Sequence, residues 1–335
     1  MFTQVHSLMV LAFSAPERFE PKLPPSPFFW MPNQATVYSE GVDSLFNLLV
    51  WISVISAAGI LAAMVYFCAK YQAPKRGAKA LSQVDHHNTL EITWSVGTLV
   101  VCLAVFAWGF KDYLSERTGP KEAYEIHAQG QKWNWTFTYP NGFVDSTLHV
   151  PVNTNVRIVI RSIDVIHSLY IPEFRVKMDA VPGRYTTLWF NATKEGTFPV
   201  DCAEYCGTHH SDMLSEVTVH DARGFEKWLA DAAKAMDNKP PVELGELIYK
   251  TRGCANCHTT DGSPKVGPSF KGVWGRKETL ASGESISVDE NYVHESLMEP
   301  QAKVVQGFAP VMPTFKGQLS DKQIAGVIAY LKSLK

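Results

Sequence analysis

The sequence has no excess of charge of either sign and no run of basic residues. Its 335 residues hold 31 lysines and arginines against 33 aspartates and glutamates, which leaves a formal net charge of −2. This balance argues against a protein that binds nucleic acid. No internal repeat is visible, and the length is sufficient for two or three domains.

The chain also has no pair of cysteines left for a structural disulfide. Two of its six cysteines lie inside long apolar runs, where a free cysteine behaves as a small hydrophobic residue. The other four form two compact motifs. The cysteines in the apolar runs are Cys68 and Cys102. The cysteines in the two motifs are Cys202 with Cys206, and Cys254 with Cys257. The pattern therefore predicts metal and cofactor chemistry and not a disulfide scaffold.

Charge is absent from two long segments near the N-terminus. Residues 45–67 and residues 92–110 contain no charged side chain over 23 and 19 positions. Each segment is long enough to cross a hydrocarbon core of about 30 Å as a helix; two buried core helices are the alternative. We therefore expect a transmembrane helical hairpin over residues 41–115.

The loop between these two segments predicts their orientation. Lys70, Lys75, Arg76 and Lys79 precede its first acidic residue, Asp85. The positive-inside rule places such a loop in the cytoplasm. Both tails would then face the periplasm, with the chain crossing a bacterial inner membrane twice.

The N-terminus is a separate region, which we assign to residues 1–40. The stretch LMVLAFSA resembles the core of a signal peptide, although no Lys or Arg precedes it. Cleavage and retention both remain open. Residues 16–32 contain six prolines and predict an extended arm.

Residues 122–236 change to an alternating pattern that is typical of β-strands. In WNWTFTY, the residues Trp133, Trp135, Phe137 and Tyr139 fall on one face, and VRIVIR alternates in the same way. The stretches YPNG and VPGR predict turns between strands. Several short strands at this spacing predict an antiparallel sandwich or barrel.

A predicted helix and a short linker follow this β-rich region. We expect the helix over residues 225–236, the linker DNKPP over residues 237–241, and a final helical module over residues 242–335. The last helix has a clear start, because Ser320 with Gln323 three residues later forms a capping box. Apolar residues then follow at the spacing of one helix face.

The final module contains CANCH, the attachment signature of c-type haem. Cys254 and Cys257 can form thioethers to the haem vinyl groups, and His258 can ligate the iron. A chance match or a redox dithiol is the alternative. We expect Met312 in PVMPTF to be the second axial ligand, with Met298 and His294 as alternatives. A Met/His pair raises the reduction potential of the haem. Pro268 in VGPSF lies where such modules pack a proline against the ligand histidine.

The stretch DCAEYCGTHHSDM gathers thiol, imidazole and thioether groups on one loop. Cys202 and Cys206 are soft ligands, His210 is borderline, and Met213 is a thioether that zinc rarely takes. This donor set favours copper, with structural zinc as the alternative. A mononuclear blue-copper site uses one cysteine. Two cysteines can instead bridge two coppers that share one unpaired electron.

A further imidazole for this site should come from another strand. His167 in DVIHSLYIPEF is the best candidate. The remaining histidines in this region are expected to be ordinary surface residues, namely His127, His149, His209 and His220.

These motifs together resemble cytochrome c oxidase subunit II with a fused cytochrome c domain, as in the caa3-type oxidases. The run C-x-E-x-C-G-x-x-H-x-x-M, with DVIHS upstream and KMDAVPG after DVIHS, carries the resemblance, which extends from Pro32 to the end of the chain. It implies two transmembrane helices, a cupredoxin-like Greek-key β-barrel and an all-α cytochrome c domain. It also implies covalent haem c and a binuclear copper A centre.

The resemblance assigns ligands to the two coppers. It implies that Cys202 and Cys206 bridge both, that His167 and Met213 complete one, and that His210 completes the other. The backbone carbonyl of Glu204 would add a ligand, and its carboxylate would reach a magnesium ion at the interface with subunit I.

Two further residues match functional positions of the family. Trp133 matches the aromatic residue through which electrons enter the copper site, and Glu91 matches the acid at the mouth of a proton channel. A solvated acid at a helix end is the alternative for Glu91. Two departures stand out. Asn134 occurs where the family usually has tyrosine, and Thr98 where a helix proline is common.

The function implied is that of subunit II of a haem–copper cytochrome c oxidase. Electrons would pass from a donor through haem c to copper A and on to subunit I, which reduces oxygen to water and translocates protons. Implied partners are subunit I with haem a and copper B, subunit III, membrane lipids, and a donor such as cytochrome c or a quinol-oxidising complex. The copper A subunit of a nitric oxide reductase and a membrane-tethered electron carrier are the alternatives.

Overall fold

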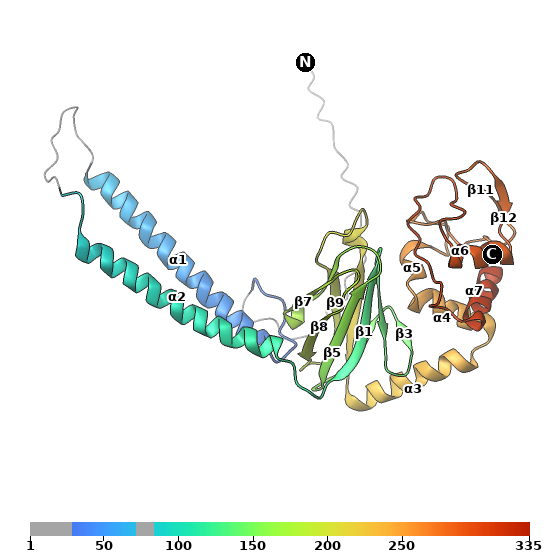
Figure 1. Cartoon of the computed structure of the whole chain (residues 1–335), viewed down its shortest axis with the longest axis horizontal. Helices are drawn as coiled ribbons and strands as arrows, with labels where there is room; N and C mark the ends of the chain where they lie inside the picture. The colour runs from blue at the N-terminus through green and yellow to red at the C-terminus, as the bar shows by residue number, and fades with distance from the viewer. Residues whose placement is uncertain (1–28, 72–83) are drawn as a thin grey trace, which may run out of the picture.

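The computed structural model describes residues 29–71 and 84–335. Along the chain these form a pair of long helices, a β-sandwich, a connecting helix and a C-terminal helical domain (Figure 1). The signal-like segment, and Lys75, Arg76 and Lys79 of the predicted cytoplasmic loop, lie outside the described residues.

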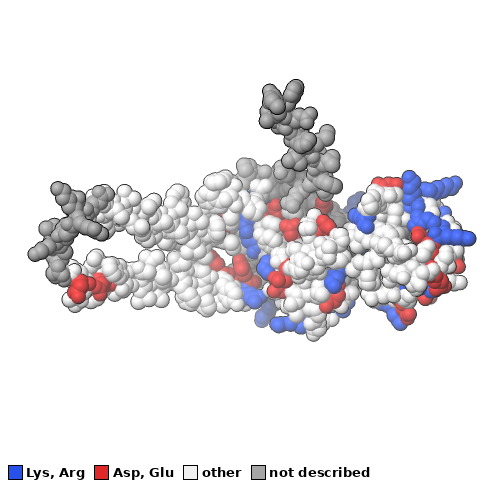
Figure 2. Space-filling view, turned by 90° about the horizontal axis from the view of Figure 1, so that it is seen from above, with Lys and Arg blue, Asp and Glu red and all other residues white. Residues whose placement is uncertain are grey.

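The two apolar segments form the long helices α1 (Ser39–Lys70) and α2 (Asn88–Arg117). Both are long and apolar enough to cross a membrane, and no residue of their most apolar windows is buried. Figure 2 shows white surface along the middle of this hairpin and charged side chains only toward its ends. α2 continues without a break through Thr98, where the family commonly has proline.

A buried ion pair joins α1 to the β-sandwich. Arg175 follows the short helix η1 (Pro172–Phe174), and its Nε lies 2.7 Å from Oδ1 of Asp43 in α1. Its second nitrogen, Nη2, donates to the other carboxylate oxygen at 2.9 Å. Removing one partner of such a buried pair costs about 3–5 kcal/mol. This pair fixes the helical hairpin against the sandwich.

The β-sandwich consists of two five-stranded sheets. The first has the order β3-β2-β1-β5-β8 and the second β4-β10-β9-β6-β7. Most neighbours are antiparallel, but β1 pairs with β5, and β4 with β10, in parallel. The strands are β1 (Tyr124–Gln131), β2 (Asn134–Thr138), β3 (Val144–Asp145), β4 (Leu148–Pro151), β5 (Asn155–Ser162), β6 (His167–Ile171), β7 (Val176–Ala180), β8 (Thr186–Asn191), β9 (Gly196–Cys202) and β10 (Leu214–His220).

Alternation in the sequence predicts the buried face of β5 correctly. Val156, Ile158 and Ile160 are fully buried between the sheets, as expected for a strand with one face on the core. β2 behaves differently, because Asn134 and Thr136 on its polar face are buried as well. One face of this edge of the sandwich is therefore covered by another part of the chain.

Helix α3 (Ala222–Asn238) leads from the sandwich to the C-terminal domain. It begins three residues before the predicted start, because the Asp221 side chain caps it by accepting a hydrogen bond from the backbone of Gly224. The next helix, α4 (Pro241–Thr251), starts almost at once. Only Lys239 and Pro240 separate the two helices, so the linker is shorter than the DNKPP stretch predicts.

The C-terminal domain packs α4 against the last helix, α7 (Asp321–Ser333). The two helices touch where Gly245 meets the backbone of Gly326, and a Cβ on Gly245 would lie 2.0 Å from that carbonyl oxygen. The capping box of Ser320 and Gln323 is present, as predicted. The smaller elements are α5 (Cys254–Cys257), β11 (Lys277–Thr279), β12 (Ser285–Ser287) and α6 (Glu290–Met298).

Two histidines expected at the surface are instead partly buried in an aromatic cluster. The rings of His149 and Trp228 stack at 4.0 Å between centroids, and His149 Nδ1 lies 2.8 Å from His220 Nε2. Burial lowers the pKa of His149 to about 3, and the nearby His220 adds to the shift. Burial also lowers the pKa of His220. The cluster fixes α3 to the sandwich with both rings neutral.

Candidate functional site

The predicted copper ligands meet at one end of the second sheet. β9 ends at Cys202, and the loop that follows carries Cys206 and the short helix η2 (His210–Asp212). The chain then enters β10, which pairs back onto β9 with Leu214 opposite Asp201. Because β6 pairs with β9 at Leu169 and Cys202, the first residue of β6, His167, is brought to the same end.

The donor atoms lie close enough to share metal ions. The two sulfur atoms of Cys202 and Cys206 are 3.8 Å apart, and the ligand atoms of His167 and both cysteines all lie within 4.8 Å of one another. The Sγ of Cys206 is 3.5 Å from Nδ1 of His210 and 3.8 Å from Sδ of Met213. All five predicted side chains therefore surround one point.

The sixth predicted ligand, Glu204, also reaches this cluster. Its backbone carbonyl oxygen lies 3.4 Å from Sγ of Cys202. Its side chain is exposed on the outer surface of the loop. The backbone thus faces the sulfur atoms while the carboxylate is free to contact a group outside this chain.

Asp164, which no sequence motif above includes as a functional residue, holds His167 in place. Its Oδ1 lies 2.8 Å from Nε2 of His167, which leaves Nδ1 facing the cluster at 3.9 Å from Cys202. The carboxylate is itself held by the backbone N–H groups of Lys132 and Val165. A carboxylate behind a ligand histidine is typical of metal sites. The acid three residues before the histidine in DVIH was the available signal.

The two cysteines differ in their tendency to ionise. Burial opposes ionisation of Cys202, but the hydrogen bonds from His167, the backbone of Ser168 and the other groups around the sulfur together outweigh it and lower its pKa to about 6. Burial and the neighbouring Cys202 raise the pKa of Cys206 to about 12. Two thiolates this close repel each other, so a cation is needed to hold both deprotonated. The donor set therefore fits a metal centre with more than one positive charge.

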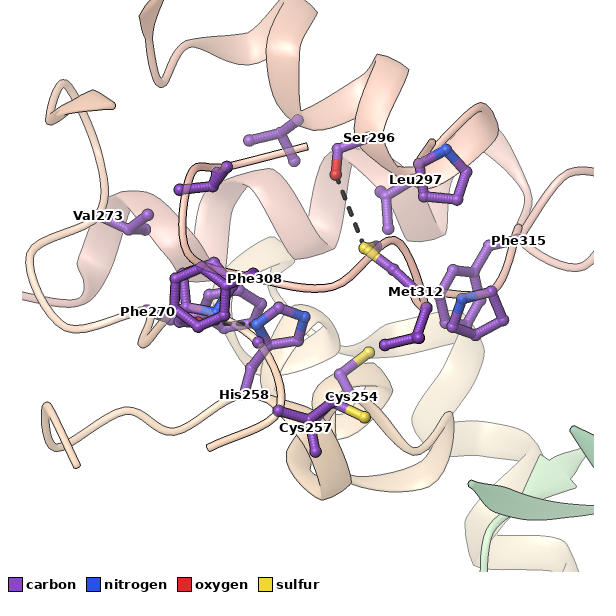
Figure 3. A pocket seen from close by; sticks show the side chains of 18 of the residues that line it. Cys254, Cys257, His258, Phe270, Val273, Ser296, Leu297, Phe308, Met312 and Phe315 are labelled. Carbon is purple, nitrogen blue, oxygen red and sulfur yellow. Dashed lines mark hydrogen bonds between the residues drawn. The ribbon is translucent and has the colours of Figure 1, made fainter. Parts of the chain in front are cut away.

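The second predicted site is a pocket in the C-terminal domain. Cys254 and Cys257 lie on the single turn of α5, and His258 follows it directly (Figure 3). Apolar residues such as Phe270, Val293, Leu297 and Phe315 line the space that these three residues face. An apolar pocket above a CxxCH turn fits a covalently attached haem.

His258 is oriented as an axial ligand would be. Its Nδ1 lies 2.8 Å from the carbonyl oxygen of Pro268, and its ring stacks on Phe270 with centroids 4.3 Å apart. Burial lowers its pKa, so the ring is neutral, and with Nδ1 bonded to a carbonyl its free lone pair is on Nε2. The expected role of Pro268 beside the ligand histidine agrees with this contact.

Of the three candidates for the second axial ligand, Met312 has the fitting position. It lines the pocket, and Figure 3 shows its side chain entering the space that His258 also borders. Met298 and His294 are not among the described residues that line the pocket. Ser296 lies 3.7 Å from the Met312 sulfur and can donate to it.

Trp133 lies between the two sites. Its indole packs edge-to-face on His209 of the cysteine loop, with centroids 4.8 Å apart, and the same residue lines the haem pocket. It is 6% exposed. His209 is thus a packing residue, and its Nδ1 also donates a hydrogen bond to Oδ2 of Asp212 at 2.8 Å.

Glu91 lies far from both sites, in the first turn of α2 at the opposite end of the hairpin (Figure 1). Its Oε1 accepts a hydrogen bond from the backbone of His87 at 3.1 Å, and its side chain is exposed. The carboxylate therefore caps the helix, while its surroundings leave it open to solvent or to a partner subunit.

Comparisons with known proteins agree with this arrangement. Residues 142–219 match the family model described as the periplasmic domain of cytochrome c oxidase subunit II, and residues 242–335 match that of cytochrome c. A cytochrome c oxidase subunit 2 of Alkalihalophilus pseudofirmus is 30% identical over 305 residues, which cover 86% of each chain. This chain belongs to the cytochrome c oxidase subunit II family.

Other relatives match a smaller share of this chain. The alternative cytochrome c oxidase subunit 2 of Bradyrhizobium diazoefficiens is 31% identical and covers 61% of this chain and 84% of its own length. The crystal structure of the periplasmic domain of subunit II from Bradyrhizobium japonicum is 35% identical, with a TM-score of 0.34, and covers 35% of this chain and 98% of its own.

Family membership makes the chain part of a haem–copper oxidase. Its two matched domains imply that it binds copper and haem c, and the two apolar helices are consistent with a membrane anchor. The predicted fold class is confirmed: two long apolar helices, a β-sandwich and a helical cytochrome c domain.

Proposed function

We propose that this subunit carries electrons from a donor through covalent haem c to a binuclear copper A centre and on to subunit I. There, oxygen is reduced to water and protons are translocated. The chain divides for this purpose into an N-terminal arm (1–40), a membrane hairpin (41–115), a copper domain (122–236) and a haem domain (242–335).

In the copper domain, Cys202 and Cys206 would bridge two coppers. His167 and Met213 would complete one copper, and His210 the other. The carbonyl of Glu204 adds a ligand. When bound, the copper pair accepts and releases one electron that both ions share. Convergence of all these donor atoms on one buried point supports this assignment.

In the haem domain, Cys254 and Cys257 would attach the cofactor, and His258 and Met312 would ligate its iron. The neutral His258 ring and the position of Met312 in the same pocket support these roles. A haem with this ligand pair has a raised reduction potential, as a carrier that feeds an oxygen-reducing enzyme requires.

The position of Trp133 is the observation that carries the proposal. This residue lines the haem pocket and packs on the loop that holds both bridging cysteines. The short link of Lys239 and Pro240 makes the contact intramolecular, which for a short tether corresponds to a roughly millimolar effective concentration. Trp133 is thus the residue through which electrons enter the copper site, and the fused haem is their immediate source.

The remaining roles concern partners. The exposed carboxylate of Glu204 would bind magnesium at the interface with subunit I. Glu91 would stand at the mouth of a proton channel on the cytoplasmic side. The copper and haem domains would face the periplasm of a bacterial inner membrane, where a cytochrome c or a quinol-oxidising complex donates electrons. Subunit III and membrane lipids complete the surroundings.

Purification of the native complex tests this function. The proposal predicts a complex that contains haem c, haem a and copper and that consumes oxygen with reduced cytochrome c as donor. A complex that reduces nitric oxide instead would identify the alternative reductase. Isolation of the chain without a catalytic partner would identify a tethered electron carrier. Family membership favours the oxidase.

A further inference from the structure

We propose that Asn134 is a positioning residue that docks the haem-attachment turn onto the copper domain. This contact restricts the copper site to electrons that come from the haem domain of the same chain. The inference rests on the proposed electron route but concerns a different property, namely how the two domains are held together.

A hydrogen bond joins strand β2 of the copper domain directly to α5, the turn that carries the haem-attachment cysteines. Nδ2 of Asn256 donates to Oδ1 of Asn134 at 2.8 Å. Asn134 is the first residue of β2 and is 6% exposed. Asn256 stands between the two cysteines that would attach the haem. A shift of Asn256 relative to Asn134 would therefore also shift the attached haem relative to the copper domain.

Gly253 provides the space that this contact needs. Its φ of +76° lies in the left-handed region, which favours glycine. A Cβ on Gly253 would lie 2.3 Å from the carboxamide of Asn134, so the two residues fit only because one of them has no side chain. Tyrosine in place of Asn134 would bring a ring against Gly253. A ring of that size would displace the turn.

Other contacts contribute most of the interface area between the two domains, while the hydrogen bond of Asn134 fixes their relative position. Val266 and Val311 of the haem domain pack against the core of the copper domain. Oγ of Ser146 donates to the backbone carbonyl of Lys250 at 3.0 Å. Apolar contacts tolerate sliding, but this hydrogen-bonded pair does not, because sliding separates Nδ2 of Asn256 from Oδ1 of the buried Asn134. The Asn134–Asn256 bond therefore selects one docked position.

This position covers the residue next to Asn134 in the chain. Trp133 is 6% exposed, and the haem pocket begins beside it, with Gln131, Lys132, Trp133 and Asn134 all in its lining. A separate cytochrome cannot contact Trp133 unless the haem domain first leaves. A free donor must therefore reduce the haem domain and not the copper domain.

Hydrogen exchange in the assembled, cofactor-loaded complex tests the docking. Asn134→Ala and Asn256→Ala should each raise the exchange rate of the backbone amides in residues 253–258 by about tenfold, because each leaves a buried amide without its partner. The double variant should be no worse than either single one. Asn291→Ala, at an exposed position of α6, is the matched control and should change nothing. Unchanged exchange in both single variants would overturn the proposal.

Measurements of electron transfer distinguish the docking role of Asn134 from the proposed electron route through the fused haem. Asn134→Tyr should slow reduction of copper by the fused haem and should allow a free cytochrome to reduce copper directly, with the copper absorption spectrum unchanged. If exchange rises but copper reduction in the unaltered complex bypasses the haem domain, the docking stands and the proposed route is wrong. If exchange and copper reduction are both unaffected in all variants, Asn134 has no positioning role.

Discussion

The indole of Trp133 lies edge-on to the ring of His209, 4.8 Å away between centroids, and so contacts the loop that carries both cysteines of the copper cluster. On its other side, the same tryptophan borders the haem pocket. A Cβ on Gly207 would lie 3.2 Å from this indole, which leaves little room between the ring and the cysteine loop. Two cofactor sites on different domains thus share one aromatic residue.

The first prediction is that the copper centre is binuclear. Cys206→Ser should abolish the electron paramagnetic resonance signal of one electron shared by two copper nuclei, because one of the two bridging sulfurs is lost. The measurement is made on the intact complex. Persistence of the same signal in the variant, or a signal from a single copper in the unaltered protein, would contradict this assignment.

The second prediction concerns the carboxylate behind His167. Asp164→Ala should weaken copper binding by about 10–100-fold, since loss of a hydrogen bond to the outer nitrogen of a ligand histidine has effects of this size. Titration with a copper chelator, followed by the absorption of the centre, measures the change. Asp212→Ala, which removes the partner of the non-ligand His209, is the control. Equal weakening in both variants would show that the loop, and not Asp164, is responsible.

The third prediction separates the candidate axial ligands of the haem. Met312→Ala should lower the reduction potential, because the thioether stabilises ferrous iron. Met298→Ala should leave the potential unchanged, since Met298 does not line the pocket and its backbone carbonyl accepts a hydrogen bond from Thr314 at 2.7 Å. Redox titration of the haem band distinguishes the two, and a reversed result would move the ligand to Met298.

The fourth prediction is a loss of stability in acid that originates in the His149–His220 pair. Both pKa values are lowered in the folded chain, so the unfolded chain binds more protons below its own histidine pKa. Stability should therefore be full above a pH of about 6.5 and should fall below it, by at most about 1.4 kcal/mol per pH unit for each histidine.

Thermal unfolding of the purified protein at pH 7.5 and 5.5 measures this effect. His149→Gln should reduce the difference between the two unfolding temperatures, because it removes one of the two titrating rings. His294→Gln, at an exposed position of the haem domain, should leave the difference as it is. An equal acid sensitivity in His149→Gln would assign the effect to other groups.

The fifth prediction concerns Glu91. Glu91→Gln keeps an acceptor for the backbone of His87 and so preserves the helix cap, but removes the group that can take up a proton. Turnover of the whole oxidase should slow while electron transfer from haem c to copper does not. If both slow equally, Glu91 has a structural role only.

The proposed cofactor residues lie together in the structure because most of their spacing is local. CxxCH lies on one turn of helix, and the donors from Cys202 to Met213 lie on one loop, so little of the fold is needed to bring them together. His167 was also predicted, although it depends on the pairing of β6 with β9. The capping box at Ser320 was equally clear.

Contacts between distant segments could not be predicted in this way. Alternation in WNWTFTY does not show what covers the polar face of β2, and the docked haem domain explains why Asn134 is buried. The partial burial of His149 and His220 depends on α3, whose Trp228 covers them. The contact of Asp164 with His167 is local, but the backbone N–H of Lys132 that holds this carboxylate comes from another strand end and required the fold.

Rapid mixing of the complex with its electron donor tests whether electrons reach copper through the fused haem. The comparison is between the intact complex and one that lacks residues 242–335. In the intact complex, haem c should be reduced first and copper should follow. The truncated complex should retain its copper absorption spectrum but lose most of its rate of copper reduction. Undiminished copper reduction after truncation would show that the donor reaches Trp133 directly, and would contradict the account.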